Sequence, residues 1–169
     1  VVITGAASGI GKEIARIYRK KKYLQILSSK DAKGLEEFAK DPDISLVTGD
    51  ITTQSTINSL VKLVENKHGR IDVLINNAGI TFIQPFEENT LAQIDLIINT
   101  NLKSHILLTS RLYPIMKKQH SGHIVFINSS AGKDGYKNHT LYSTAKFGLS
   151  GFAKSLRLEA KQYNIKVTS

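Results

Sequence analysis

The chain has 169 residues, which suits a single domain with one core, and it carries a net charge of +9. It contains no cysteine, so disulfide bonds and thiolate metal sites are excluded. No apolar run approaches the roughly 20 residues of a membrane span, and no signal peptide is recognisable, so we expect a cytoplasmic protein with no membrane partner. The densest basic run, residues 19–22, lacks the interleaved aromatic residues of a nucleic-acid site, and we interpret it as a solvated helix end.

Six short apolar runs along the chain predict strands. Several of them lack alternation of polar and apolar residues, as strands buried on both faces do. The runs lie at residues 1–4, 24–27, 44–47, 71–75, 123–127 and 165–167. Apolar residues at helical spacing follow the first and third runs, at residues 10–17 and 57–64. Strands and helices therefore alternate.

Two longer helices are expected in the second half of the chain. The first lies between residues 91 and 118, and Thr90 with Gln93 forms a capping box at its start. Pro114 should kink its last turns. One face of this helix carries an apolar stripe, which consists of Leu91, Ile94, Ile98, Leu102, Ile106 and Tyr113. The second long helix runs from about residue 142 to residue 163.

This alternation predicts the α/β class, with a doubly wound parallel sheet covered by helices on both faces in a three-layer α/β/α arrangement. No linker, repeat or low-complexity stretch interrupts it, so we expect one domain over residues 1–169. Ligands of such sheets bind outside the carboxyl ends of the strands. A functional site is therefore expected among the residues that follow each strand.

A glycine-rich stretch, "TGAASGIG" at residues 4–11, follows the first strand and opens the first helix. Its glycines would let the backbone approach a pyrophosphate, whose charge the helix N-terminus stabilises. The spacing is G-x-x-x-G-x-G rather than G-x-G-x-x-G, and such glycines also fit an ordinary turn. The strand–loop–helix context favours a nucleotide site.

Polar residues follow the third and fourth strands. Asp50 is a candidate acceptor for an adenine amino group, and it could equally be the cap of the next helix. Residues 76–79 read "NNAG", whose amides can bridge neighbouring loops by hydrogen bonds. The plainer interpretation of these four residues is a polar turn.

Tyr142 and Lys146 stand four residues apart, which is one turn of a helix. An ammonium beside a phenol favours the phenolate, so the pKa of the tyrosine would fall from its reference of about 10. That pairing would provide a proton donor and acceptor usable near neutral pH. The spacing alone also fits two unrelated surface residues.

Ser129 follows the fifth strand and could meet Tyr142 at the same crevice. A nucleophilic serine would need a histidine as base and an acidic residue that orients it. The spacing of the five histidines does not fit such a catalytic triad. His120 and His123 flank a serine and a glycine before a strand, which is poor metal geometry. We therefore expect neither a hydrolytic triad nor a metal site.

The stretches "TGAASGIG", "NNAG", "NSSAG" and "YSTAK", in this order and spacing, resemble the short-chain dehydrogenase/reductase family of the Y-x-x-x-K type. The resemblance covers essentially the whole chain, and the combination is specific although each motif alone is weak. It implies a Rossmann-type fold, with residues 1–169 as a single dinucleotide-binding and catalytic domain. It also implies an NAD(P)-dependent oxidoreductase that transfers hydride reversibly between a nicotinamide cofactor and a ketone or secondary alcohol.

The roles of the family's residues carry over to the matching positions. Tyr142 would be the catalytic acid/base, and Lys146 would lower its pKa and hold the nicotinamide ribose. Ser129 would hydrogen-bond the substrate oxygen, and Asn101 would hold a water in the proton relay behind the lysine. The other residues expected around the pyrophosphate, the adenine and the adenosine ribose are Gly5, Ser8, Gly9, Ile10, Gly11, Asp50, Ile51, Asn77, Ala78 and Gly79.

The end of the second strand bears on the choice of dinucleotide. In Rossmann-type sheets an acidic residue there accepts hydrogen bonds from the ribose 2′-hydroxyl and repels a 2′-phosphate. The resemblance to the family places Ser29 at that position and Lys30 at the position of the basic residue of NADP users, which favours NADP(H). NAD(H) is the alternative, because Asp31 would be the discriminating acid if the register differed by one residue.

The chain begins inside an apolar run without a methionine and ends at "IKVTS", where the family continues into a substrate lid. We therefore expect a sequence truncated at its carboxyl end. The residues present predict only the class of substrate, a small carbonyl compound or alcohol. The family's subunits often pair through the two long helices. Ile106, Phe152 and Leu156 would then contribute apolar area to a homodimer or homotetramer.

Two other classes of function compete with the enzyme. One is a catalytically silent dinucleotide-binding sensor or scaffold, and the other is a basic nucleic-acid binder. The complete set of Asn101, Ser129, Tyr142 and Lys146 favours the enzyme, because a scaffold has no chemical need for all four. A nucleic-acid binder would need a basic stripe away from the crevice, and we expect no nucleic acid as a partner.

Overall fold

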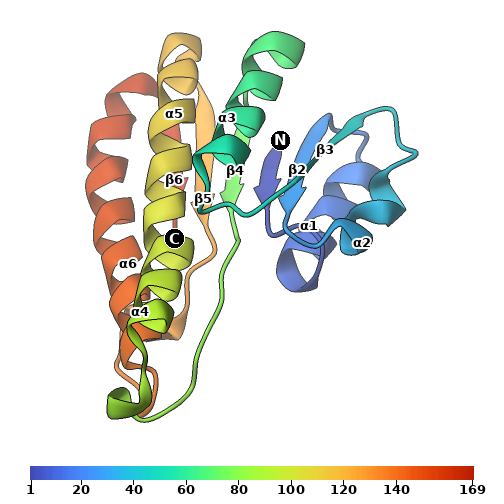
Figure 1. Cartoon of the computed structure of the whole chain (residues 1–169). Coiled ribbons are helices and arrows are strands. Elements are labelled where there is room, and N and C mark those ends of the chain that lie inside the picture. Colours follow the sequence, from blue (N-terminus) through green and yellow to red (C-terminus); the bar gives the residue numbers. More distant parts are fainter.

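A six-stranded parallel sheet forms the centre of the protein in a computed structural model that describes residues 1–169 (Figure 1). The strands are β1 (Val2–Thr4), β2 (Gln25–Ser29), β3 (Ile44–Thr48), β4 (Val73–Asn76), β5 (Gly122–Phe126) and β6 (Ile165–Thr168). Their order in the sheet is β3-β2-β1-β4-β5-β6, and every neighbouring pair is parallel. The doubly wound α/β fold is therefore confirmed, and all six predicted strands are present with ends shifted by one or two residues.

Helices connect the strands and end at the edge of the sheet where the strands begin. The α-helices are α1 (Gly9–Lys20), α2 (Ala32–Leu35), α3 (Gln54–Leu63), α4 (Leu91–Ile98), α5 (Ser104–Gln119) and α6 (Thr140–Ala160). Short 3₁₀ turns span Glu36–Phe38, Phe86–Glu88, Ser130–Gly132 and Lys161–Tyr163, and π-helical turns span Val64–His68 and Asn99–Lys103. None of the helices combines the length and the apolar character needed to cross a membrane.

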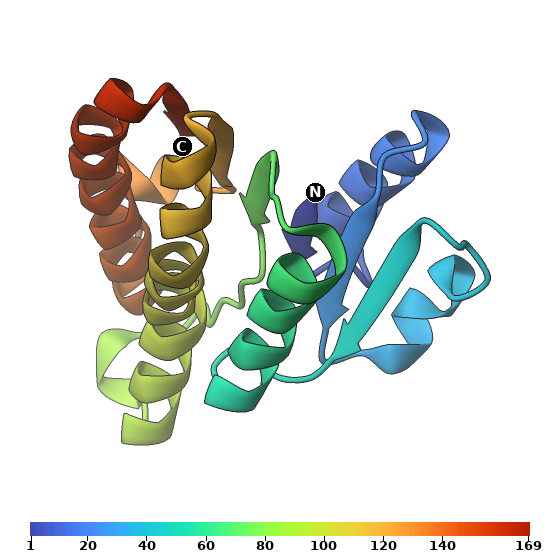
Figure 2. The same ribbon diagram turned by 90° about the horizontal axis from the view of Figure 1, so that it is seen from above.

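The sheet separates two apolar clusters, because successive strand residues point to opposite faces. On one face Val2 and Leu74 pack with side chains of α3, α5 and α6. On the other face Ile3 and Ile75 pack with side chains of α1 and α2. Figure 2 shows these two groups of helices on either side of the strands. Each central strand is buried on both sides, which explains why its sequence is a continuous apolar run.

The long helix expected over residues 91–118 is interrupted by the π-helical turn Asn99–Lys103. The predicted capping box of Thr90 and Gln93 is present, and the helix continues past Pro114 to its end. Its buried side chains, however, are not the predicted apolar stripe. Leu91 of the stripe is 74% exposed and the other members are half-buried, whereas the buried face carries Ile97, Asn101, Ser104, His105, Leu108, Thr109, Leu112 and Met116. Because that face contains polar residues, a prediction based on apolar periodicity does not identify it as the buried face.

Candidate functional site

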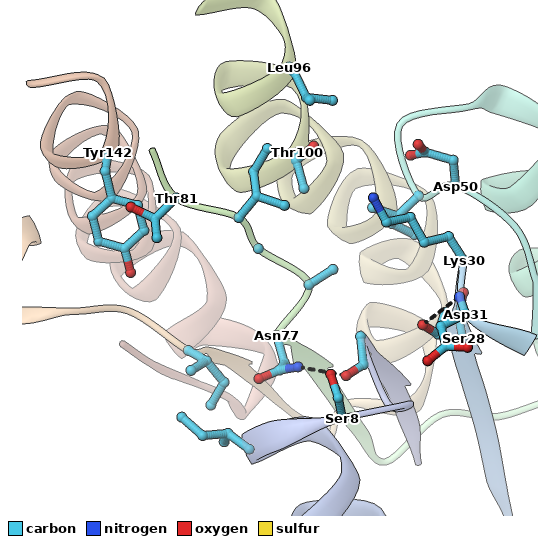
Figure 3. A pocket seen from close by; sticks show the side chains of 18 of the residues that line it. Ser8, Ser28, Lys30, Asp31, Asp50, Asn77, Thr81, Leu96, Thr100 and Tyr142 are labelled. Carbon is cyan, nitrogen blue, oxygen red and sulfur yellow. Dashed lines mark hydrogen bonds between the residues drawn. The ribbon is translucent and has the colours of Figure 1, made fainter. Parts of the chain in front are cut away.

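A cleft of about 490 Å³ opens at the carboxyl ends of β1 to β5. Its lining residues are Gly5, Ser8, Ile10, Ser28, Ser29, Lys30, Asp31, Gly49, Asp50, Ile51, Asn77, Ala78, Gly79, Ile80, Thr81, Leu96, Thr100, Ile127, Asn128, Tyr142 and Lys146. Figure 3 shows Tyr142 and Thr81 at one end, Lys30 and Asp50 at the other, and Asn77 between them. Most of the predicted site residues therefore meet in one place; those that do not line the cleft are Gly9, Gly11, Asn101 and Ser129.

The glycine turn is shaped by close packing against the loop that follows β4. Gly5 has a φ of +65°, and a Cβ there would lie 2.8 Å from Asn77 Nδ2 and 2.9 Å from Ala78 Cα. A Cβ on Gly11 would collide with the carbonyl oxygen of Gly5. These two positions therefore require glycine for space, and Gly5 also for its backbone conformation.

The amino end of α1 faces this cleft, and no side chain caps its free N–H groups. Ser8 is the N-cap of α1, yet its side chain makes no capping hydrogen bond. No acidic residue lies in the first turn of the helix. The hydroxyl and the first-turn N–H groups are thus available to an anion, which the helix dipole also favours.

The "NNAG" segment is held by the side chain of Thr4, the last residue of β1. Its Oγ1 accepts hydrogen bonds from the N–H groups of Asn77 (3.0 Å) and Ala78 (3.1 Å). The side chain of Asn77 adds two hydrogen bonds, in which its Nδ2 donates to the carbonyl oxygens of Thr4 (2.9 Å) and Gly5 (3.2 Å). The segment therefore bridges the glycine turn and β4, as its amides suggested.

Two buried side chains of the α4–α5 helix hold the next part of the same segment. Asn101 accepts from the N–H of Ile80 (2.8 Å) and donates to its carbonyl (2.7 Å). His105 Nε2 lies 2.7 Å from the carbonyl oxygen of Ala78. A carbonyl can only accept, so Nε2 carries the proton, and burial keeps the ring neutral by lowering its pKa to about 4.

This arrangement limits what Asn101 can do in a proton relay. Both ends of its side-chain amide are engaged with Ile80, and the residue is fully buried behind the cleft wall. The side chain therefore serves in this structure to hold the backbone of Ile80, and the role of Asn101 in a proton relay stays a prediction.

Tyr142 and Lys146 lie one turn apart on α6, as their spacing predicted. The ammonium nitrogen of Lys146 is 5.6 Å from the centroid of the Tyr142 ring and donates a hydrogen bond to the carbonyl of Ile127 (2.7 Å). Lys146 is 4% exposed, and this burial lowers its pKa to about 8. The ring of His139, one turn earlier, meets the Tyr142 ring edge to face at 6.4 Å.

Ser129 lies beside the cleft and not in it. Its Oγ accepts the N–H of Ala131 (3.2 Å) and caps the short 3₁₀ turn Ser130–Gly132. It lines a neighbouring hollow, and Asn128 belongs to the walls of both. The structure thus brings the serine to the end of β5, as predicted, with its hydroxyl turned to its own loop.

The far end of the cleft carries the residues expected to choose the dinucleotide. Ser29 Oγ accepts the N–H of Asp31 (3.2 Å), and the Asp31 carboxylate caps α2 by accepting the N–H of Gly34 (3.1 Å). Asp50 accepts two hydrogen bonds from Thr52, both at 2.8 Å, which lower its pKa. Lys30 is exposed beside them.

Three residues with structural roles at this site were not identified from the sequence. Thr4 and His105 hold the "NNAG" segment, and Ile127 supplies the carbonyl that binds Lys146. A threonine at the end of a buried strand and a histidine on the core side of a helix are signals of buried hydrogen bonding. Ile127 acts through its backbone, so its side chain carries no signal.

Comparison with known proteins agrees with this geometry. The fold and the cleft define a Rossmann-like, doubly wound α/β protein, and the chain belongs to the family described as short chain dehydrogenase, which matches residues 1–169. Sepiapterin reductase of Chlorobaculum tepidum is 33% identical over 180 residues, covering 99% of this chain and 74% of the relative. 3-Dehydrosphinganine reductase of Danio rerio is also 33% identical, over 178 residues, covering 99% of this chain and 54% of the relative.

Solved structures of the same kind superpose closely. A metagenomic short-chain oxidoreductase in complex with NADP has a TM-score of 0.92 at 31% identity, covering 100% of this chain and 79% of that one. A short-chain dehydrogenase from Streptomyces avermitilis has a TM-score of 0.93 at 29% identity, covering 98% of this chain and 62% of that one. The chain spans about half to four fifths of the length of these relatives.

Proposed function

We propose that this chain forms the dinucleotide-binding and catalytic part of an NADP(H)-preferring oxidoreductase that interconverts ketones and secondary alcohols. The observation that carries the proposal is the cleft itself. It has Tyr142 and Lys146 at one end, a glycine turn in its middle, and Ser29 with Lys30 at the other end. This order matches the parts of a nicotinamide dinucleotide from the reactive ring to the adenosine phosphate.

The cleft residues fit such a cofactor. The close packing at Gly5 and the unengaged Ser8 hydroxyl at the start of α1 suit a pyrophosphate. Asp50 has remaining acceptor capacity for an adenine amino group. When bound, the cofactor would supply or take up the hydride.

The protein's own groups would handle the proton. The Tyr142 phenol would give a proton to the substrate oxygen in reduction and take it back in oxidation. Lys146, fixed by the Ile127 carbonyl, would place a cation beside that phenol and hold the nicotinamide ribose. The Ser129 hydroxyl accepts from the Ala131 N–H and keeps its own proton, which it would donate to the substrate oxygen once the side chain rotates towards the cleft.

A tyrosine substitution tests this assignment directly. In the full-length protein, Tyr142→Phe should lower kcat for carbonyl reduction by at least about 100-fold, while NADPH affinity stays within a factor of two or so. Lys146→Ala should damage both quantities. Wild-type turnover by the phenylalanine variant on every competent substrate would refute the proposed role of Tyr142.

The preference for NADP(H) rests on Ser29 and Lys30. A hydroxyl and an ammonium can bind a 2′-phosphate, whereas the Asp31 carboxylate is engaged at the start of α2. We expect kcat/KM to be higher with NADPH than with NADH, and Ser29→Asp should reverse the order. A preference for NADH that disappears in Asp31→Ala would mean that Asp31 is the discriminating acid.

We also propose a homodimer or homotetramer built on α5 and α6. Of the three residues expected at such an interface, Leu156 is buried within the monomer and is thereby excluded, whereas Ile106 and Phe152 remain half-buried. Sedimentation of the full-length protein at micromolar concentration tests the assembly. A monomer there would contradict it.

A further inference from the structure

Two loops flank Tyr142 at the mouth of the cleft, and we call them the mouth loops: residues 81–88 and residues 133–139. The main-chain N–H of Gln84 donates to the carbonyl of Asn138 (3.1 Å), which joins the two loops. They lie together below the sheet in Figure 1, next to the start of α6. Thr81, in the first mouth loop, lines the cleft beside Tyr142 (Figure 3). A group that leaves the cleft past Tyr142 therefore meets the mouth loops.

The mouth loops present large apolar side chains to solvent. Ile83 is 63% exposed, Phe86 is 60% exposed and Tyr136 is 47% exposed. The ring of Tyr136 is connected to the site through His139, because Tyr136 meets His139 edge to face at 6.1 Å and His139 meets Tyr142 at 6.4 Å. Exposed apolar side chains gathered beside a cleft are typical of a ligand-binding surface.

The charges of the mouth loops nearly cancel. The cations are Lys133 and Lys137, and the anions are Glu87, Glu88 and Asp134, which leaves a net charge of about −1 at neutral pH. The mouth loops themselves therefore add no net attraction for an anionic substituent. Recognition is thereby left to apolar and aromatic contact.

We propose that the mouth loops bind the substituent of the reacting carbonyl, and that the substrate is an uncharged ketone or alcohol with an aromatic or bulky apolar group next to the reacting carbon. This inference rests on the proposed oxidoreductase function. The carbonyl oxygen would lie at Tyr142, and the substituent would extend over His139 towards Tyr136 and Ile83. An apolar pocket discriminates between substituents by 10- to 200-fold for small changes in size.

Three carbonyl compounds test the proposal with full-length protein and saturating NADPH. Acetophenone carries an aromatic group, 2-butanone a small one, and 4-acetylbenzoate the same ring with a carboxylate remote from the carbonyl. We expect kcat/KM for acetophenone to exceed that for each of the others by at least about 10-fold. Equal values for all three would overturn this inference while leaving the oxidoreductase function standing. No turnover with any carbonyl compound would overturn both.

Substitutions locate the effect on the mouth loops. Tyr136→Ala and Ile83→Ser should each lower kcat/KM for acetophenone by about 10-fold and change that for 2-butanone by less than about 2-fold. Leu158→Ala is the matched control, because Leu158 is 78% exposed on α6 far beyond Lys146, and it should change neither value. NADPH binding, read by fluorescence, reports that each variant is folded. Unchanged selectivity in both mouth-loop variants would show that other parts of the polypeptide cover these side chains, and would refute the proposal.

Discussion

Replacing Thr4 by valine should destabilise the protein without changing the shape of its core. The side chain is fully buried, and its hydroxyl accepts hydrogen bonds from the N–H groups of Asn77 and Ala78. Valine fills the same volume but cannot accept, so both N–H groups lose their partner. A buried polar group left without a partner costs about 1–3 kcal/mol. Because these two amides are only partly buried, we expect a total loss near the lower end, about 2–3 kcal/mol.

Urea unfolding of the wild type, Thr4→Val and Thr4→Ser measures this loss. Serine keeps the acceptor and removes one methyl group, which should cost about 1 kcal/mol. The midpoint of Thr4→Val should therefore fall well below that of Thr4→Ser at an unchanged m-value. NADPH affinity should fall in the same order, because the segment held by Thr4 lines the cleft. Equal stability of the two variants would refute the argument that this hydroxyl holds the "NNAG" segment.

The other predictions concern two buried ionisable groups and one glycine. The folded chain holds the pKa of His105 near 4, whereas its value in the unfolded chain is about 6.5. The free energy of unfolding should therefore fall by up to about 3 kcal/mol as the pH drops from 6.5 to 4. Urea titrations at several pH values measure this fall, which should be smaller in His105→Gln. Lys146 loses its proton above about pH 8, so the rate of carbonyl reduction should fall above that pH. The free energy of unfolding should rise with pH up to about 10.5, the pKa of lysine in the unfolded chain. A rate that stays constant up to pH 10 would contradict the proposed role of the ammonium. Gly11→Ala should weaken NADPH binding and lower the melting temperature, since the added methyl meets the Gly5 carbonyl; calorimetry with and without NADPH measures both effects.

The fold could be predicted because its strands are short apolar runs buried on both faces. Val2 and Ile3, for example, point into different clusters and must both be apolar, so the run has no polar interruption. The cleft could be predicted for a related reason. Parallel strands end at one edge, which brings Gly5, Asp50 and Asn77 together although they are far apart in the sequence.

The contacts behind the cleft wall could not be predicted in the same way. The buried face of α5 includes Ser104, His105 and Thr109, whose polarity is compensated by hydrogen bonds that only the tertiary structure reveals. Apolar periodicity therefore selects the half-buried stripe instead. Ser129 is a second case, because its position after β5 was predictable, whereas the orientation of its hydroxyl depends on the local turn.

The π-helical turn sets the rotational phase between α4 and α5. Each residue of an α-helix advances the side-chain direction by about 100°. In Asn99–Lys103 the ladder closes over five residues, with the Ser104 N–H bonded to the Asn99 carbonyl, so one extra residue is accommodated without displacing either flank. Deleting a single residue between Asn101 and His105 would therefore restore a regular α-ladder and leave α5 in its present orientation relative to α4. Deleting one residue from the regular ladder of α5 would instead rotate every side chain beyond it by about 100°. The cleft wall thus tolerates a change in length at the π-helical turn that it does not tolerate elsewhere in this helix.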